Sequence, residues 1–132
     1  MNEKTAILCV DDEVIILTAL VRELKMAFGN RFLYEQATDA LGGLQAVEDL
    51  AAEGIRVILI LSDWLMPGMK GDEFLEKVQE RHPGIAAVVI TGQADQAAID
   101  RLKANASIRA VLPKPWNSAE LKRIIEESAS EA

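Results

Sequence analysis

One apolar stretch constrains the fold of this chain more than any other. Val57–Leu61 contains five consecutive apolar residues and is followed at once by Ser62 and Asp63. An apolar run this short, rich in β-branched side chains, is typical of a strand buried on both faces. Pro67 and Gly68 then predict a loop, because proline lacks a backbone N–H and glycine accepts positive φ. Asp63 is therefore predicted at the carboxyl end of a central strand, where open α/β sheets bind ligands. Capping of the following turn is the simpler alternative for its role.

The rest of the chain alternates between short apolar runs and stretches with helical periodicity. Further strands are predicted at Ala6–Val10, Phe32–Ala37, Ala86–Ile90 and Ile108–Leu112. Helices are predicted after the successive strands, at about 14–28, 39–53, 71–81, 95–105 and 117–128. Helices that connect parallel strands cross over on both faces of the sheet, so this order predicts a three-layer, doubly wound α/β fold.

Some predicted elements differ from the others in polarity. The strand at Phe32–Ala37 has mixed polarity and is expected at an edge of the sheet. The second helix is expected to bury a stripe made of Leu41, Leu44, Val47 and Leu50. The fourth helix has an inward face of mostly alanine, so we expect it to be the least firmly anchored. The last residues, Ser128–Ala132, are expected to fray.

Length and charge limit the classes of function. The 132 residues predict a single domain over 1–132, with its core at about 5–128. A net charge of −7 argues against direct binding to nucleic acid or anionic membranes, although solubility alone also explains it. No apolar run approaches the roughly 20 residues of a membrane span, and the polar N-terminus resembles no signal peptide. The single cysteine, Cys9, forms no internal disulfide, which favours a cytoplasmic location.

Polar residues of a specific kind follow four of the five predicted strands. They are Asp11-Asp12, Asp63, Thr91 and Lys114. The carboxyl ends of parallel strands lie along one edge of the sheet, so these residues are expected to converge on one crevice.

Their chemistry indicates phosphoryl transfer. Three neighbouring carboxylates repel one another unless a cation lies among them, and an oxygen-only set of ligands suits Mg²⁺. Lys114 offers a positive charge and Thr91 a hydroxyl, both suited to the oxygens of a phosphoryl group. Asp63 would be the nucleophile.

The chain resembles the receiver domains of two-component response regulators, including the chemotaxis-type regulators. The resemblance extends from about Thr5 to Ser128 and rests on Asp11-Asp12, Ser62–Gly71, Thr91-Gly92 and Lys114-Pro115. It implies a flavodoxin-like sheet in the strand order 2-1-3-4-5. In this family Asp63 would be the phosphoacceptor and a ligand of Mg²⁺. Asp12 would bind the metal directly, Asp11 through water, and the backbone carbonyl of Leu65 would be a third protein ligand.

The resemblance also implies partners and a switch. Thr91 and Lys114 would bind the phosphoryl group, the donor would be a histidine kinase or phosphotransfer protein, and an output domain or downstream protein would read the result. The switching surface would be the fourth helix, fifth strand and fifth helix. Val111 stands where many receivers carry an aromatic switch residue, Leu65 where many carry a polar residue, and Pro113 is also unusual.

Other functions compete with this interpretation. The same fold could be a constitutive interaction module without phosphotransfer. Loss of the acid pair, of Asp63 or of Lys114 would favour that alternative, and none of them is lost. A Mg²⁺-dependent phosphohydrolase would need a second acid at Leu65, and an FMN-binding protein would need a phosphate-cradling first loop. We therefore expect a domain that catalyses only its own phosphorylation and dephosphorylation, either alone or within a longer regulator. Trp64 and Trp116 could be packing residues or, if exposed, partner contacts.

Overall fold

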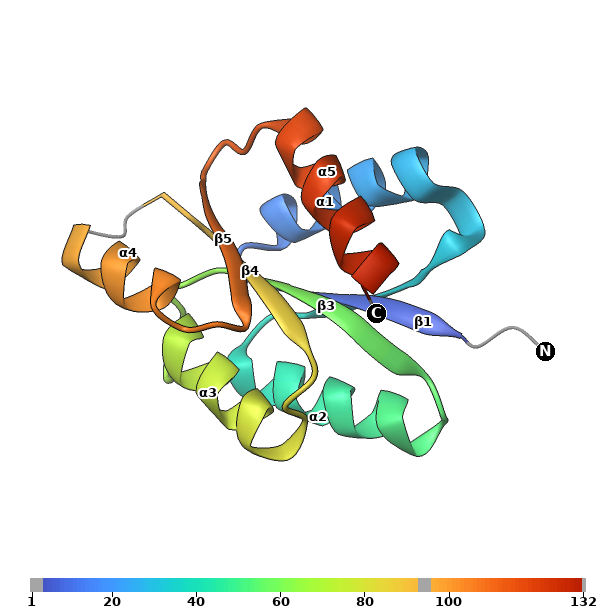
Figure 1. Ribbon diagram of the computed structural model, residues 1–132, viewed down its shortest axis with the longest axis horizontal. Helices are drawn as coiled ribbons and strands as arrows, with labels where there is room; N and C mark the ends of the chain where they lie inside the picture. Colours follow the sequence, from blue (N-terminus) through green and yellow to red (C-terminus); the bar gives the residue numbers. More distant parts are fainter. Residues whose placement is uncertain (1–3, 93–95, 132) are drawn as a thin grey trace.

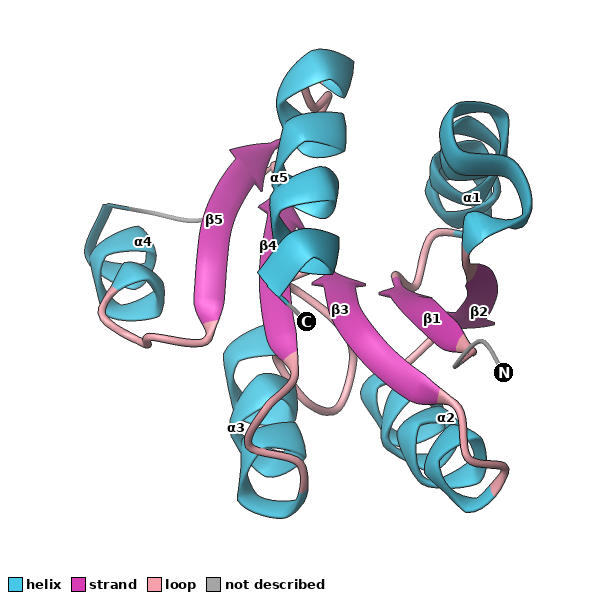
Figure 2. Ribbon diagram, turned by 45° about the vertical axis from the view of Figure 1, so that its right-hand side comes forward, coloured by secondary structure: helices cyan, strands magenta, loops and turns pink. Residues whose placement is uncertain are grey.

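The computed structural model describes residues 4–92 and 96–131. Five parallel strands form one sheet in the order β2-β1-β3-β4-β5 (Figure 2). The strands are β1 (Thr5–Val10), β2 (Leu33–Ala37), β3 (Arg56–Ser62), β4 (Ala86–Thr91) and β5 (Ile108–Pro113). The helices are α1 (Val14–Phe28), α2 (Ala40–Ala52), α3 (Gly71–Arg81), α4 (Gln96–Lys103) and α5 (Ser118–Glu131), with a 3₁₀ turn η1 (Gly29–Arg31) after α1. The predicted doubly wound fold and strand order are confirmed.

Helices cover both faces of the sheet (Figure 1). One core cluster joins the sheet to α1 and α5, with Leu24 and Ile125 among its fully buried side chains. A second cluster joins the opposite face to α2, α3 and α4, with Phe74 and Leu102 buried there. The central strand β3 contributes to both clusters, which explains why its residues Val57 to Leu61 are all apolar.

The edge position predicted for the second strand is also confirmed. Strand β2 pairs with β1 at one end of the sheet order, and most of its residues are exposed or half-buried. Its buried residue is Ala37, whose carbonyl accepts a hydrogen bond from Asp11 N–H at 3.2 Å. The edge strand therefore still supports the backbone at the carboxyl end of β1.

The buried face of α2 differs from the predicted stripe. Leu41 is 71% exposed, whereas Ala40 and Gly43 are buried along with Val47 and Leu50. A Cβ added at Gly43 would lie 2.8 Å from the Phe74 ring. The close approach of this α3 side chain therefore requires a small residue on α2, and the larger Leu41 is turned outward.

The length of α5 differs from the prediction. Helix α5 continues to Glu131, so the prediction that the chain frays from Ser128 is wrong for residues 128–131, and Ala132 lies outside the described residues. Ser128 is buried and its hydroxyl donates to the Ile124 carbonyl at 2.8 Å. Helix α4 begins at Gln96, and its predicted cap, Asp95, lies outside the described residues. No helix in the described part of the chain has both the length and the apolar character to cross a membrane.

Candidate functional site

Asp63 occupies the first position after the central strand β3. It is only 6% exposed, and its backbone N–H donates to the Val10 carbonyl at 2.9 Å, which continues the pairing of β3 with β1. Its carboxylate Oδ1 accepts a hydrogen bond from Trp64 N–H at 2.8 Å. The parallel pairing of two buried strands thus holds Asp63 at the end of β1, where the acid pair begins.

The acid pair lies beside Asp63, as the strand pattern predicted. One carboxylate oxygen from each of Asp11, Asp12 and Asp63 lies within 4.8 Å of the other two. Asp11 is buried, and its Oδ1 accepts from Glu13 N–H at 2.9 Å at the start of α1. Asp12 is exposed. The three carboxylates could hold a metal ion, with Asp12 on the solvent side of the group.

Lys114 reaches the same cluster from the far end of the chain. Its Nζ lies 2.8 Å from Asp11 Oδ2, 3.5 Å from Asp63 Oδ1 and 3.8 Å from Glu13 Oε1. Burial alone would lower the pKa of Lys114, but the hydrogen bond to Asp11 and the surrounding negative charges outweigh it and raise the pKa. The ammonium group therefore stays protonated at neutral pH and partly compensates the acidic cluster.

Burial has the largest effect on the pKa of Asp63. Burial and the negative charge of Asp11 raise the pKa of Asp63 to about 6, against the opposing effects of Lys114 and of the Trp64 N–H. A cation bound among the carboxylates would favour the ionised, nucleophilic form of Asp63.

Thr91 ends β4 next to β5, the strand that directly precedes Lys114. Thr91 is paired in register with Pro113, and its side chain is buried at 6% exposure. A Cβ added at Gly92 would lie 3.8 Å from Lys114 Cβ, so Gly92 lies beside the lysine. Neighbouring strands therefore place the hydroxyl and the ammonium group along the same edge of the sheet.

The loop after β3 is packed tightly against the site. Trp64 is buried, which confirms packing as its role, and its Nε1 has no hydrogen-bond partner among the described residues. Lys70 Nζ lies 5.5 Å from the centroid of the Trp64 ring. Leu65 is half-buried and packs against the core cluster of α2, α3 and α4. The metal-ligand role of the Leu65 carbonyl stays a prediction.

Gly71 has a role that the sequence pattern did not reveal. It begins α3, its N–H donates to the Trp64 carbonyl at 2.7 Å, and an added Cβ would lie 2.4 Å from the Asp63 carbonyl oxygen. Gly71 therefore lets the start of α3 press against the backbone of Asp63.

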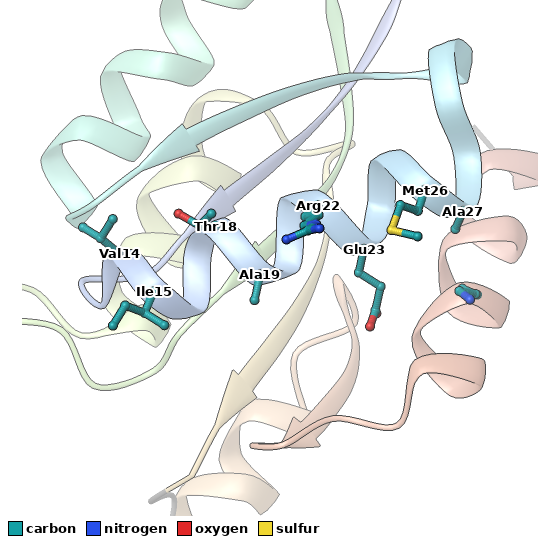
Figure 3. A pocket seen from close by; sticks show the side chains of 9 residues that line it. Val14, Ile15, Thr18, Ala19, Arg22, Glu23, Met26 and Ala27 are labelled. Atoms are coloured by element: carbon teal, nitrogen blue, oxygen red, sulfur yellow. The ribbon is translucent and has the colours of Figure 1, made fainter.

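Sequence analysis also missed an apolar groove on α1. The groove has a volume of about 770 Å³, and Val14 and Ile15 lie at one end of it and Met26 near the other (Figure 3). These three side chains are 61%, 84% and 81% exposed. They are apolar residues outside the buried stripe of α1, a pattern visible in the sequence. None of Asp11, Asp12, Asp63 and Lys114 lines the groove.

Comparison with known proteins agrees with this arrangement. Residues 7–126 match the response regulator receiver domain family. A crystal structure of a CheY-like response regulator receiver domain protein from Methanospirillum hungatei JF-1 aligns with a TM-score of 0.82 and 31% identity, covering 97% of this chain and 95% of that chain.

Curated relatives are longer proteins. The hydrogenase transcriptional regulatory protein HoxA of Cupriavidus necator is 36% identical over 117 residues, which are 88% of this chain and 22% of HoxA. The sensor kinase CckA of Brucella abortus is 28% identical over 127 residues, 96% of this chain and 13% of CckA. The chain thus spans less than a quarter of either relative. The fold, the residues at the strand ends and the family match agree, and this chain belongs to the response regulator receiver domains of two-component systems.

Proposed function

We propose that Asp63 accepts a phosphoryl group and that this reaction switches the domain between two signalling states. The observation that supports it best is the convergence at the sheet edge. Three carboxylates offer oxygens within 4.8 Å of one another, and Lys114 Nζ lies 3.5 Å from Asp63 Oδ1. A buried nucleophile, an acidic pocket for a cation and a fixed ammonium group are the parts that phosphoryl transfer to a carboxylate requires.

The reaction is a substitution at phosphorus. A carboxylate oxygen of Asp63 forms the new O–P bond while the bond from phosphorus to the donor atom breaks, and the donor leaves with its electron pair. Lys114 pairs with one of the phosphoryl oxygens, and the Thr91 hydroxyl donates to another. Because Lys114 already lies between Asp11 and Asp63, it needs only a small movement to reach the new group.

The donor set fits Mg²⁺. All three side chains offer carboxylate oxygens, which Mg²⁺ prefers, and an ion with few protein ligands keeps several waters. Asp12 and Asp63 would bind the ion, with Asp11 acting through water and the Leu65 carbonyl as a further ligand. When bound, Mg²⁺ offsets the negative charge of the acids and of the incoming phosphoryl group.

The proposed partners are those implied by membership of the receiver domain family. The donor is a histidine kinase or a phosphotransfer protein, and an output domain or downstream protein reads the face formed by α4, β5 and α5. The net charge of −7 supports protein partners rather than direct contact with nucleic acid or membranes. The domain, which extends over residues 1–132, acts in the cytoplasm and catalyses only its own phosphorylation and dephosphorylation.

The test uses a small phosphodonor with Mg²⁺. Incubation with acetyl phosphate should add the mass of one phosphoryl group, labile to hydroxylamine, and Asp63→Asn should abolish the addition. Asp49→Asn is the matched control, because Asp49 is an exposed carboxylate on α2. A wild-type protein that takes no phosphoryl group from acetyl phosphate or from a panel of phosphorylated kinases would favour the constitutive interaction module instead.

A further inference from the structure

Glu23 of α1 binds the segment that follows Lys114. Two donors from the segment after β5 converge on Glu23 of α1. Trp116 Nε1 donates to Glu23 Oε2 at 3.0 Å, and the Ser118 hydroxyl donates to Glu23 Oε1 at 2.7 Å. Each carboxylate oxygen thus receives one hydrogen bond, and both bonds are partly buried. Hydrogen bonds to a charged acceptor are the stronger kind.

Figure 3 shows the Glu23 side chain leaving α1 with its carboxylate pointing away from the helix. The side chain also lines the groove formed by α1 and Lys122 of α5. Trp116, the residue it holds, packs against the core cluster of α1 and α5. The tether therefore combines two charge-assisted hydrogen bonds with an apolar anchor.

The contacts of Glu23 with Trp116 and Ser118 connect the segment after Lys114 to the helix that follows the acid pair. Helix α1 begins directly after the acid pair, where Glu13 N–H donates to Asp11 Oδ1. Asp11 in turn accepts from Lys114 Nζ at 2.8 Å. Both members of the Asp11–Lys114 ion pair are thus attached to α1, Asp11 through the chain and Lys114 through Trp116 and Glu23. Without the Glu23 hydrogen bonds, Lys114 would be held by β5 on one side and by the packing of Trp116 alone on the other.

We propose that Glu23 is a positioning residue for Lys114. By holding Trp116 and Ser118 it fixes the loop after β5, so that the ammonium group meets a phosphoryl group on Asp63. The inference rests on the proposed phosphorylation of Asp63. Its physical reason is that lysine has a long, flexible stem, so the placement of its backbone decides how much of its charge reaches the reacting group.

The alternative is that Glu23 merely joins α5 to α1, and the two roles predict different measurements. Glu23 contacts none of the three carboxylates in the hydrogen bonds and ion pairs recorded for the described residues. If Glu23 positions Lys114, its substitution should weaken the binding of a phosphoryl group and leave the affinity for Mg²⁺ unchanged. A general loss of structure affects both together.

The experiment measures three quantities in Glu23→Gln and Glu23→Ala. The rate of phosphorylation by acetyl phosphate and the affinity for the phosphoryl mimic beryllofluoride should fall about three- to tenfold, the equivalent of one or two lost hydrogen bonds. The affinity for Mg²⁺ alone should change by less than about twofold, because its ligands are untouched. Gln keeps one acceptor oxygen, so its loss should be smaller than that of Ala.

Glu126→Gln is the matched control. Glu126 also links α5 to the N-terminal half, through Arg31 at 2.7 Å, but it does not contact the lysine loop. All three quantities should stay at wild-type values in this variant. Thermal unfolding checks that each variant is folded. If Glu23→Ala does not fold, Trp116→Phe replaces it, because this variant removes one of the two hydrogen bonds to Glu23 and keeps an aromatic ring at position 116. A shifted Trp116 indole N–H resonance in Glu23→Gln would report the altered contact directly.

A second comparison identifies the route of the effect. In a Lys114→Ala background, Glu23→Gln should cause no further loss in the phosphorylation rate, measured over hours by intact mass. If Lys114→Ala accepts no measurable phosphoryl group, the positioning role is tested instead by comparing the affinities of the Glu23 single variants for beryllofluoride and for Mg²⁺. Additive losses, equal losses of beryllofluoride and Mg²⁺ affinity, or a wild-type rate in Glu23→Gln would each overturn the proposal. Failure of the wild-type protein to accept a phosphoryl group would contradict the proposed function instead.

Discussion

At the scale of single residues, Asp63 shows a conflict between function and stability. The unfolded chain releases the proton of an aspartate at its ordinary pKa of 3.8, whereas burial raises the pKa of Asp63 to about 6 in the folded protein. Between these values the folded state retains a proton that the unfolded state has lost. The contribution of Asp63 to stability is therefore present at low pH and is lost as the pH rises from about 4 to about 6.

Replacing this carboxylate should stabilise the protein at neutral pH. In EDTA at pH 8, Asp63→Asn should raise the free energy of unfolding by on the order of 2 kcal/mol, because the amide carries no buried charge beside Asp11. Below about pH 4 the difference should disappear. Urea unfolding of both proteins across this pH range measures it. A variant less stable than the wild type at pH 8 would mean that attraction to Lys114 exceeds the cost of burial.

At the scale of elements, the start of α3 is the part most sensitive to a small change. Gly71→Ala places a Cβ within 2.4 Å of the Asp63 carbonyl oxygen, so the helix or the strand end must move. We expect a loss of about 1–3 kcal/mol in the free energy of unfolding and slower phosphorylation by acetyl phosphate. Gly84→Ala is the control, since no atom lies within 4 Å of its added Cβ. Wild-type stability in Gly71→Ala would contradict the close packing of α3 on Asp63.

Helix α4 is the element that we expect to respond to phosphorylation. It has eight residues, and its buried residues are Ala98 and Leu102, so little apolar surface resists its movement. Val111 has one stiff χ1 and cannot swing a ring between two positions. Hydrogen exchange with and without beryllofluoride should therefore show altered protection at 96–106. Changes confined to β5 and α5 would contradict this expectation.

At the scale of the whole molecule, the two core clusters share one sheet. Trp64 belongs to the cluster of α2, α3 and α4, while Trp116 packs against the cluster of α1 and α5. Because β1, β3 and β4 contribute to both, the faces should unfold together. Urea unfolding followed by fluorescence in Trp64→Phe and in Trp116→Phe should each agree with the circular dichroism of the same protein. Separate transitions for the two faces would indicate two folding units within residues 1–132.

The sequence by itself determined the elements, their order and the residues at the strand ends. The pattern of apolar residues shows which face of a segment is buried. It located β3 and correctly predicted that β2 lies at an edge of the sheet. Parallel strands share one edge, so the acid pair and Asp63 could be placed together from the order of motifs alone. The roles of Asp63, Thr91 and Lys114 in phosphoryl transfer stay predictions.

Only the tertiary structure decided which residues approach closely across elements. The periodicity of its own helix predicted Leu41 in the core, but the close approach of Phe74 requires Gly43 on the buried face. Trp116 was open to two roles until the fold brought Glu23 within 3.0 Å of its indole nitrogen. The physical reason is that apolar periodicity shows only which face of a helix or strand is buried, and not which side chains will pack against that face. Close packing and paired hydrogen bonds depend instead on the particular side chain that a distant segment brings to the same place.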